Sequence, residues 1–168
     1  MSTLLIHHPA CLGHATPLGH PERADRMRVI DRILEHERFQ PLEREAAALG
    51  TREMVEMAHP GTYFDELSGQ IPSEGMHRLD DDTTLSPGSM EAALRAVGGA
   101  CQAVDEVFDK KVKNAFVTVR PPGHHAESKR AMGFCLFNNA GIAAHWARRR
   151  HGAERVVVMD FDVHHGNG

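Results

Sequence analysis

Two clusters of histidine and carboxylate residues could carry chemistry in this chain. The downstream cluster is Asp160-Phe-Asp-Val-His-His-Gly-Asn-Gly168, and it directly follows the apolar run 156–159. Within it, Asp162 and His164 are two residues apart, and a carboxylate with an imidazole at this spacing can bind one metal ion, with Zn²⁺ as the preferred choice. A catalytic zinc usually takes three protein ligands and a water. This pair therefore needs at least one further ligand from elsewhere.

The upstream cluster is Arg120-Pro-Pro-Gly-His-His-Ala126, and it also follows an apolar run, at 115–119. Two prolines and a glycine form a stiff turn, which would hold His124 and His125 at the end of a strand. Imidazole titrates near neutral pH, so both side chains suit general acid–base work beside a metal-bound water. A single pair such as His7-His8 is more often a surface feature. Two pairs that each follow a strand-like run favour a site.

The elements that would position these clusters alternate between strand and helix. Strands are predicted at 4–6, 44–48, 115–119 and 155–162. Helices are predicted at 21–36, at 51–69 with a break near Pro60-Gly61, at 86–111 and at 138–150. Residues 70–85 are predicted to form a long polar loop. This alternation predicts a parallel sheet covered on both faces, with its site at the carboxyl ends of the strands. On a strand at 155–162, Asp160, Asp162 and His164 would share one face.

Composition excludes several classes of function. The chain has 168 residues, the size of one domain, and a net charge of −4 with no basic stripe for direct nucleic-acid binding. No apolar run approaches the roughly 20 residues of a membrane span, and the first residues lack the features of a signal peptide. The three cysteines, Cys11, Cys101 and Cys135, have no Cys-x-x-Cys spacing. They indicate reduced thiols and a cytoplasmic protein.

Several strings resemble the zinc-dependent histone deacetylase family. They are the two clusters above, Gly133-Phe-Cys-Leu-Phe-Asn-Asn139, and His20-Pro-Glu-Arg-Ala-Asp-Arg26. Their form is similar to the class II and bacterial deacetylase and acetylpolyamine amidohydrolase branch. The resemblance implies a three-layer α/β/α parallel sheet of the arginase/deacetylase type, here incomplete. Residues 1–168 would form the N-terminal part of a single deacetylase-like domain, truncated after the Asp-x-Asp-x-His-His-Gly-Asn-Gly string.

The resemblance implies a metal centre as well. Asp162 and His164 match two of the family's three zinc ligands, and the third is an aspartate that lies downstream of this segment. A tyrosine or histidine that polarises the scissile carbonyl also lies downstream. Asp160, together with the backbone carbonyls of Asp162 and His164, matches a monovalent cation site, which we expect to take K⁺.

Other roles carried over from the family concern catalysis and substrate. The catalytic group comprises His124, His125, Asp160 and Asn167, in which the last two hold the tandem histidines. The substrate-binding group comprises Gly133 and Phe134 in the tunnel wall, Asp82 at the rim, and Arg26 in an internal cavity beneath the zinc.

The implied reaction is zinc-dependent hydrolysis of an N-acetylated amine, either acetyl-lysine in a protein or an acetylpolyamine. Two alternatives remain open at this point. The chain could be a catalytically dead metal-binding or interaction module, or a fragment with no function of its own. A parallel sheet that lacks further strands would expose an edge and an apolar face, so we expect the chain alone to aggregate or form homo-oligomers.

Overall fold

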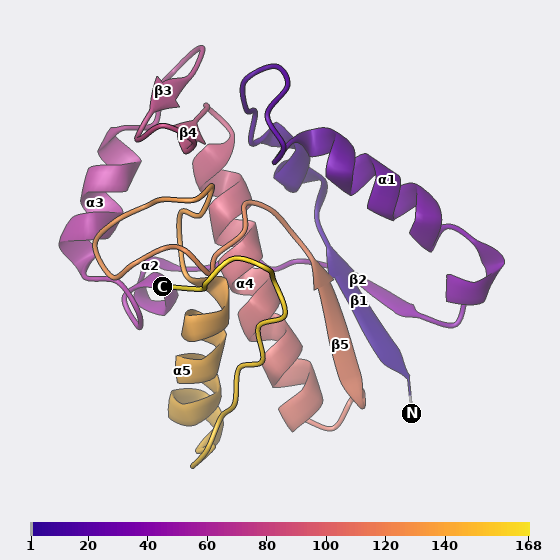
Figure 1. Cartoon of the computed structure of the whole chain (residues 1–168). Coiled ribbons are helices and arrows are strands. Elements are labelled where there is room, and N and C mark those ends of the chain that lie inside the picture. Colours follow the sequence, from indigo (N-terminus) through magenta and orange to yellow (C-terminus); the bar gives the residue numbers. More distant parts are fainter. Residues whose placement is uncertain (1) are drawn as a thin grey trace.

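The computed structural model describes residues 2–168 and shows an α/β fold (Figure 1). The strands are β1 (Thr3–His7), β2 (Glu43–Ala46), β3 (His77–Arg78), β4 (Thr84–Leu85) and β5 (Asn114–Thr118). The α-helices are α1 (Ala24–Leu34), α2 (Arg52–Val55), α3 (Gly61–Gly69), α4 (Ser89–Phe108) and α5 (Asn139–His151). Two short 3₁₀ helices, η1 (Pro9–Gly13) and η2 (Glu37–Phe39), complete the regular elements.

The main sheet is parallel and has the strand order β2-β1-β5. Leu5 in the central strand pairs with Arg44 of β2 and with Phe116 of β5. The connections from β1 to β2 and from β2 to β5 run in opposite directions across the sheet. Since such crossovers are right-handed, α1 and α4 lie on opposite faces (Figure 1). The predicted parallel α/β architecture is confirmed.

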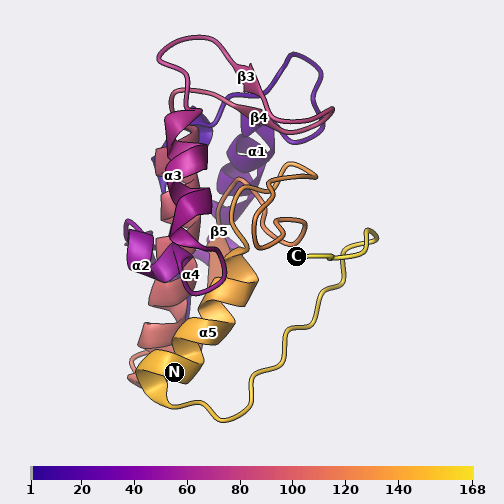
Figure 2. The same cartoon turned by 90° about the vertical axis from the view of Figure 1, so that its left-hand side faces the viewer.

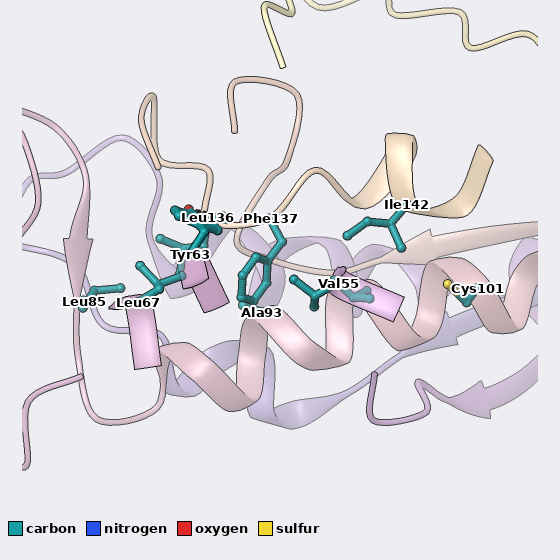
Figure 3. Packing of buried hydrophobic residues seen from close by; sticks show 10 residues of the cluster. Val55, Tyr63, Leu67, Leu85, Ala93, Cys101, Leu136, Phe137 and Ile142 are labelled. Atoms are coloured by element: carbon teal, nitrogen blue, oxygen red, sulfur yellow. Dashed lines mark hydrogen bonds between the residues drawn. The ribbon is translucent and has the colours of Figure 1, made fainter. Parts of the chain in front are cut away.

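Helix α4 is the centre of the hydrophobic core. The cluster on its outer side includes Ala93, Val97, Tyr63 and Phe137, which are buried together with side chains of α2, α3 and α5 (Figure 3). A second cluster, which includes Leu4, Ile6, Ala47 and Val112, fills the space between α4 and the sheet. Helix α4 therefore packs against the sheet on one side and against α2, α3 and α5 on the other.

Most predicted elements form, with ends shifted by a few residues. The loop predicted at 70–85 contains the short antiparallel pair of β3 and β4, in which His77 pairs with Leu85. The break predicted near Pro60-Gly61 separates α2 from α3. In the described part of the chain, no helix is both long and apolar enough to cross a membrane.

The predicted strand at 155–162 is wrong. Residues 152–168, called here the C-terminal segment, leave the end of α5 and run as an extended chain beside the body of the protein (Figure 2). Within residues 2–168, this segment makes no ladder of backbone hydrogen bonds to the free edge of β5. Apolar residues form a strand only when they are also paired and covered. Here Val157, Met159 and Phe161 are almost fully exposed.

Candidate active site

The turn that carries the tandem histidines is fixed by a buried arginine. Arg120 follows β5 and is 1% exposed. Its Nε and Nη2 each donate to one carboxylate oxygen of Glu22 at 2.7 Å, and its Nη1 donates to the carbonyls of Cys11 and His14. Bidentate pairing of this kind fixes direction as well as distance. Because Arg120 follows β5 and Cys11 follows β1, these bonds connect the carboxyl ends of the two adjacent strands. The histidines lie at this end of the sheet.

His124 is held by a carboxylate. Its Nδ1 donates to Oδ2 of Asp160 at 2.8 Å, across 36 residues of sequence. This hydrogen bond, together with one from the backbone N–H of Asp162, lowers the pKa of the Asp160 carboxyl. The carboxylate therefore fixes the direction of the His124 ring and places a negative charge beside its Nδ1.

His125 is held by an amide instead. Its Nδ1 lies 2.8 Å from Oδ1 of Asn167, and its ring centroid is 4.1 Å from that of His124. Gly133 lies against the other side of the ring. A Cβ at this glycine would come within 2.5 Å of the His125 ring, and its φ of +57° also favours glycine. The imidazole therefore has a fixed partner on one side and a close backbone on the other.

Asp162 and His164 meet in a local turn rather than on a strand. Oδ1 of Asp162 accepts hydrogen bonds from the backbone N–H of His164 at 2.8 Å and from its Nδ1 at 2.9 Å. These bonds lower the pKa of the Asp162 carboxyl. An oxygen and a nitrogen donor side by side fit the ligand chemistry of zinc. Residues 2–168 bring no group of three His, Cys, Asp or Glu side chains together as metal ligands.

Most of the site residues predicted from the sequence line a single hollow of about 440 Å³. Asp160 and Asn167 do not line it, but they contact the two histidines that do. The predicted residues that line the hollow are Arg26, Asp82, His124, His125, Gly133, Phe134, Asp162 and His164.

Phe134, the predicted tunnel-wall residue, is supported by groups from two segments, the loop that carries His20 and the loop that carries Asp82 and Thr83. Its φ is +68°, and its backbone N–H donates to Oγ1 of Thr83 at 3.1 Å. Its ring meets His20 edge to face, with centroids 4.7 Å apart. His20 in turn bonds the carbonyl of Asp82 through Nε2 at 3.0 Å. His20, to which the sequence assigned no role, thus connects Phe134 with Asp82, the predicted rim residue.

Two further histidines, His14 and His59, are buried structural groups. His14 is 2% exposed and hydrogen-bonds Oγ of Ser89 at 2.7 Å. Burial and the nearby Arg120 lower its pKa to about 4. His59 accepts from the backbone N–H of Asn138 at 2.9 Å, and its other nitrogen bonds the carbonyl of Ser128.

Three residues that support the candidate site were not predicted from the sequence: Glu22, His20 and Glu127. The first two lie inside the His20-Pro-Glu string, which gave them no partner. Glu127 accepts a hydrogen bond from Nδ2 of Asn167 at 2.8 Å. No spacing rule predicts this contact, because 40 residues separate the two side chains.

Comparison with known proteins gives consistent matches to deacetylases. The Probable deacetylase of Methanothermobacter thermautotrophicus is 39% identical over 165 residues, which cover 98% of this chain and 48% of that protein. The Histone deacetylase-like amidohydrolase of Pseudomonas aeruginosa is 37% identical over 151 residues, covering 89% and 40%. The chain thus spans about half the length, or less, of these relatives.

A solved structure matches the fold closely. The crystal structure of the HDA15 HD domain aligns with a TM-score of 0.93 at 35% identity, covering 99% of this chain and 49% of that one. The family model described as Histone deacetylase domain matches residues 20–168, which include all four strings quoted above. The chain therefore belongs to the histone deacetylase domain family.

Proposed function

We propose that residues 1–168 form the N-terminal part of a single deacetylase-like domain in a zinc-dependent amidohydrolase. The reaction is removal of acetyl groups from N-acetylated amines. One observation carries this proposal: two adjacent imidazoles, each held at 2.8 Å through Nδ1, line the same hollow as the Asp162–His164 donor pair. The relatives named a deacetylase and an amidohydrolase support the reaction class.

Asp162 and His164 would hold the zinc ion, and a third ligand would come from outside this pair. The bound ion would supply Lewis-acid polarisation of the acyl oxygen and a lowered pKa for water. Asp160, with the backbone carbonyls of Asp162 and His164, would hold a potassium ion. The donors fit this division, since zinc takes nitrogen and carboxylate ligands while a hard cation takes oxygen ligands.

The two histidines would divide the proton transfers between them. His125 would accept a proton from the attacking water at Nε2 as the oxygen bonds to the acyl carbon. When the C–N bond breaks, the same group would deliver that proton to the leaving amine. His124, held by the Asp160 carboxylate, would stabilise the developing oxyanion.

The substrate would enter past Asp82 along the wall formed by Gly133 and Phe134. Such a wall suits a thin acyl-amine stem, which both acetyl-lysine and an acetylpolyamine present. Arg26 lines the same hollow, 3.7 Å from the Glu22 carboxylate, but its side chain is 55% exposed rather than enclosed in an internal cavity.

We place the protein in the cytoplasm, because Cys11, Cys101 and Cys135 are free and buried thiols.

We also expect copies of residues 1–168 to associate. In the described sheet β5 is an edge strand, and Phe116 on it is 54% exposed. Exposed strand edges beside apolar side chains are sites of self-association. A monodisperse monomer in sedimentation analysis would contradict this expectation.

The test uses the complete gene product that contains residues 1–168, assayed on acetyl-lysine and acetylpolyamine substrates with zinc content measured alongside. His125→Ala should lower turnover by about 10²–10⁴-fold and retain zinc, because a positioned base contributes that much. Asp162→Ala should lose both zinc and turnover, whereas Asp109→Ala, an exposed aspartate at the end of α4, should lose neither. Near-normal rates in His125→Ala would contradict the assigned role. Zinc binding with no turnover on either substrate class would favour a metal-binding or interaction module.

A further inference from the structure

We propose that Glu127 is a positioning residue that sets the tautomer of His125 through the side-chain amide of Asn167. Three side chains form an unbroken line of hydrogen bonds. Nδ1 of His125 lies 2.8 Å from Oδ1 of Asn167, and Nδ2 of Asn167 donates to Oε1 of Glu127 at 2.8 Å. The consequence for catalysis rests on the proposed function, whereas the tautomer itself does not.

The donor and acceptor roles follow from the carboxylate. An ionised carboxylate accepts hydrogen bonds and cannot donate them, so the NH₂ end of Asn167 must face Glu127. The carbonyl end of the same amide then faces His125. Because that oxygen only accepts, the hydrogen of the neutral imidazole must lie on Nδ1. Nε2 of His125 is left bare and able to accept a proton.

Glu127 is well placed to impose this order because its own backbone is fixed. Its N–H donates to the carbonyl of Arg130 at 3.0 Å, and its carbonyl accepts from the N–H of Arg130 in return. The carbonyl of Ser128, inside this short turn, is bonded by the buried His59. On the other side, the N–H of Gly168 donates to the carbonyl of His124 at 2.9 Å, which holds Asn167 against the histidine turn.

The arrangement differs from that of the neighbouring histidine. His124 touches the carboxylate of Asp160 directly, so a full negative charge lies on its Nδ1. For His125 the charge of Glu127 is one amide away, and its direct partner is neutral. Glu127 therefore transmits orientation to His125 with little of its charge. This division gives His124 a charged partner on Nδ1 and His125 a neutral partner that leaves its Nε2 free.

The experiment measures the tautomer directly. The complete gene product that contains residues 1–168 is labelled with ¹⁵N-histidine, and long-range ¹H–¹⁵N spectra are recorded without metal at mildly alkaline pH, where imidazole is neutral. His125 is identified by the signals lost in His125→Gln. The wild-type chain should show hydrogen on Nδ1 of His125.

Substitutions of Glu127 test whether this side chain sets the tautomer of His125. Glu127→Lys offers only donors, so the Asn167 amide should turn over and His125 should change to the Nε2–H tautomer. Glu127→Met fills similar space with no strong partner and should give a mixture of tautomers. Glu74→Lys makes the same charge change at an exposed glutamate elsewhere and should leave His125 as in the wild type.

Two results would overturn the proposal. One is a wild-type His125 with hydrogen on Nε2. The other is an unchanged His125 tautomer in the Lys variant while the signals of the buried His14 and His59 show an intact fold. Should the Lys variant lose those signals, the Met variant decides, and a wild-type tautomer there would also overturn it. Absence of deacetylase activity would count against the proposed function alone, since the tautomer is read without turnover.

Discussion

The body of the protein, residues 2–151, and the C-terminal segment contribute to one site in different ways. The body has a continuous core around α4 and presents His124 and His125 on a turn anchored by a buried ion pair. The C-terminal segment is largely exposed, yet it supplies Asp160 and Asn167, the partners of those histidines (Figure 2). One half of the site is therefore fixed by packing, and the other half is fixed by polar contacts alone.

The difference has an energetic basis. A net hydrogen bond is worth about 0.5–1.5 kcal/mol, whereas fixing the backbone of one residue costs about 1–2 kcal/mol. Because the C-terminal segment buries little apolar area, its hydrogen bonds offset the cost of ordering its residues by a smaller margin than packing does in the body. Segments with few buried contacts open at low free energy. We expect the histidine turn to persist under conditions in which its partners have moved away.

The largest expected effect is on stability, and it comes from making the same substitution, Phe→Ala, in each of the two regions. Phe137→Ala removes a ring that is 1% exposed and packs against Tyr63 and Phe64. It should lower the free energy of unfolding by about 3–5 kcal/mol in urea denaturation. Phe161→Ala in the C-terminal segment, where the ring is 95% exposed, should leave it nearly unchanged. Equal losses in both variants would show that the segment is packed against the body in solution.

A comparable effect is expected at the anchor of the histidine turn. Arg120→Met keeps most of the side-chain volume but leaves the buried Glu22 without its cation. Breaking a buried pair in this way costs about 3–5 kcal/mol. The matched control is Arg28→Ala, which breaks the exposed pair with Asp25 and should have a far smaller effect. If both variants unfold at the same urea concentration, Arg120 does not anchor the turn.

Acid should weaken the body through His14. Its pKa is about 4 in the folded protein, below the ordinary value of 6.5, so the unfolded chain binds a proton first as pH falls. The contribution of neutral His14 is complete above pH 6.5, decreases between 6.5 and about 4, and is gone below that, a difference of about 3 kcal/mol. His14→Gln should flatten this part of the stability curve. A wild-type curve that is level across this window would contradict the buried neutral form.

How far the sequence alone predicts the molecule also differs between the two regions. The helix at α4 was predictable because Ala93, Val97 and Cys101 repeat at helical spacing and are buried together. The run at 156–159 has the same apolar character but no paired edge, and pairing is a property of the whole sheet. Apolar composition alone therefore predicted a strand that does not form.

For the site, residue types and family resemblance predicted which groups would meet, but not what holds them. The contacts of Asp160 with His124 and of Asn167 with His125 follow the expected pairing. The supports at Glu22 and Glu127 depend on side-chain directions across 40 to 98 residues of sequence, which no local pattern contains.

The most direct test of the proposed zinc site is a calorimetric zinc titration of the chain of residues 1–168, beside the variants Asp162→Ala and His164→Ala. Because these residues offer two donors where a catalytic zinc takes three, we predict weak binding that either substitution abolishes. Tight one-to-one zinc binding by the wild-type chain would contradict a site with only two ligands, and binding that survives both substitutions would contradict the assignment of Asp162 and His164 as those ligands.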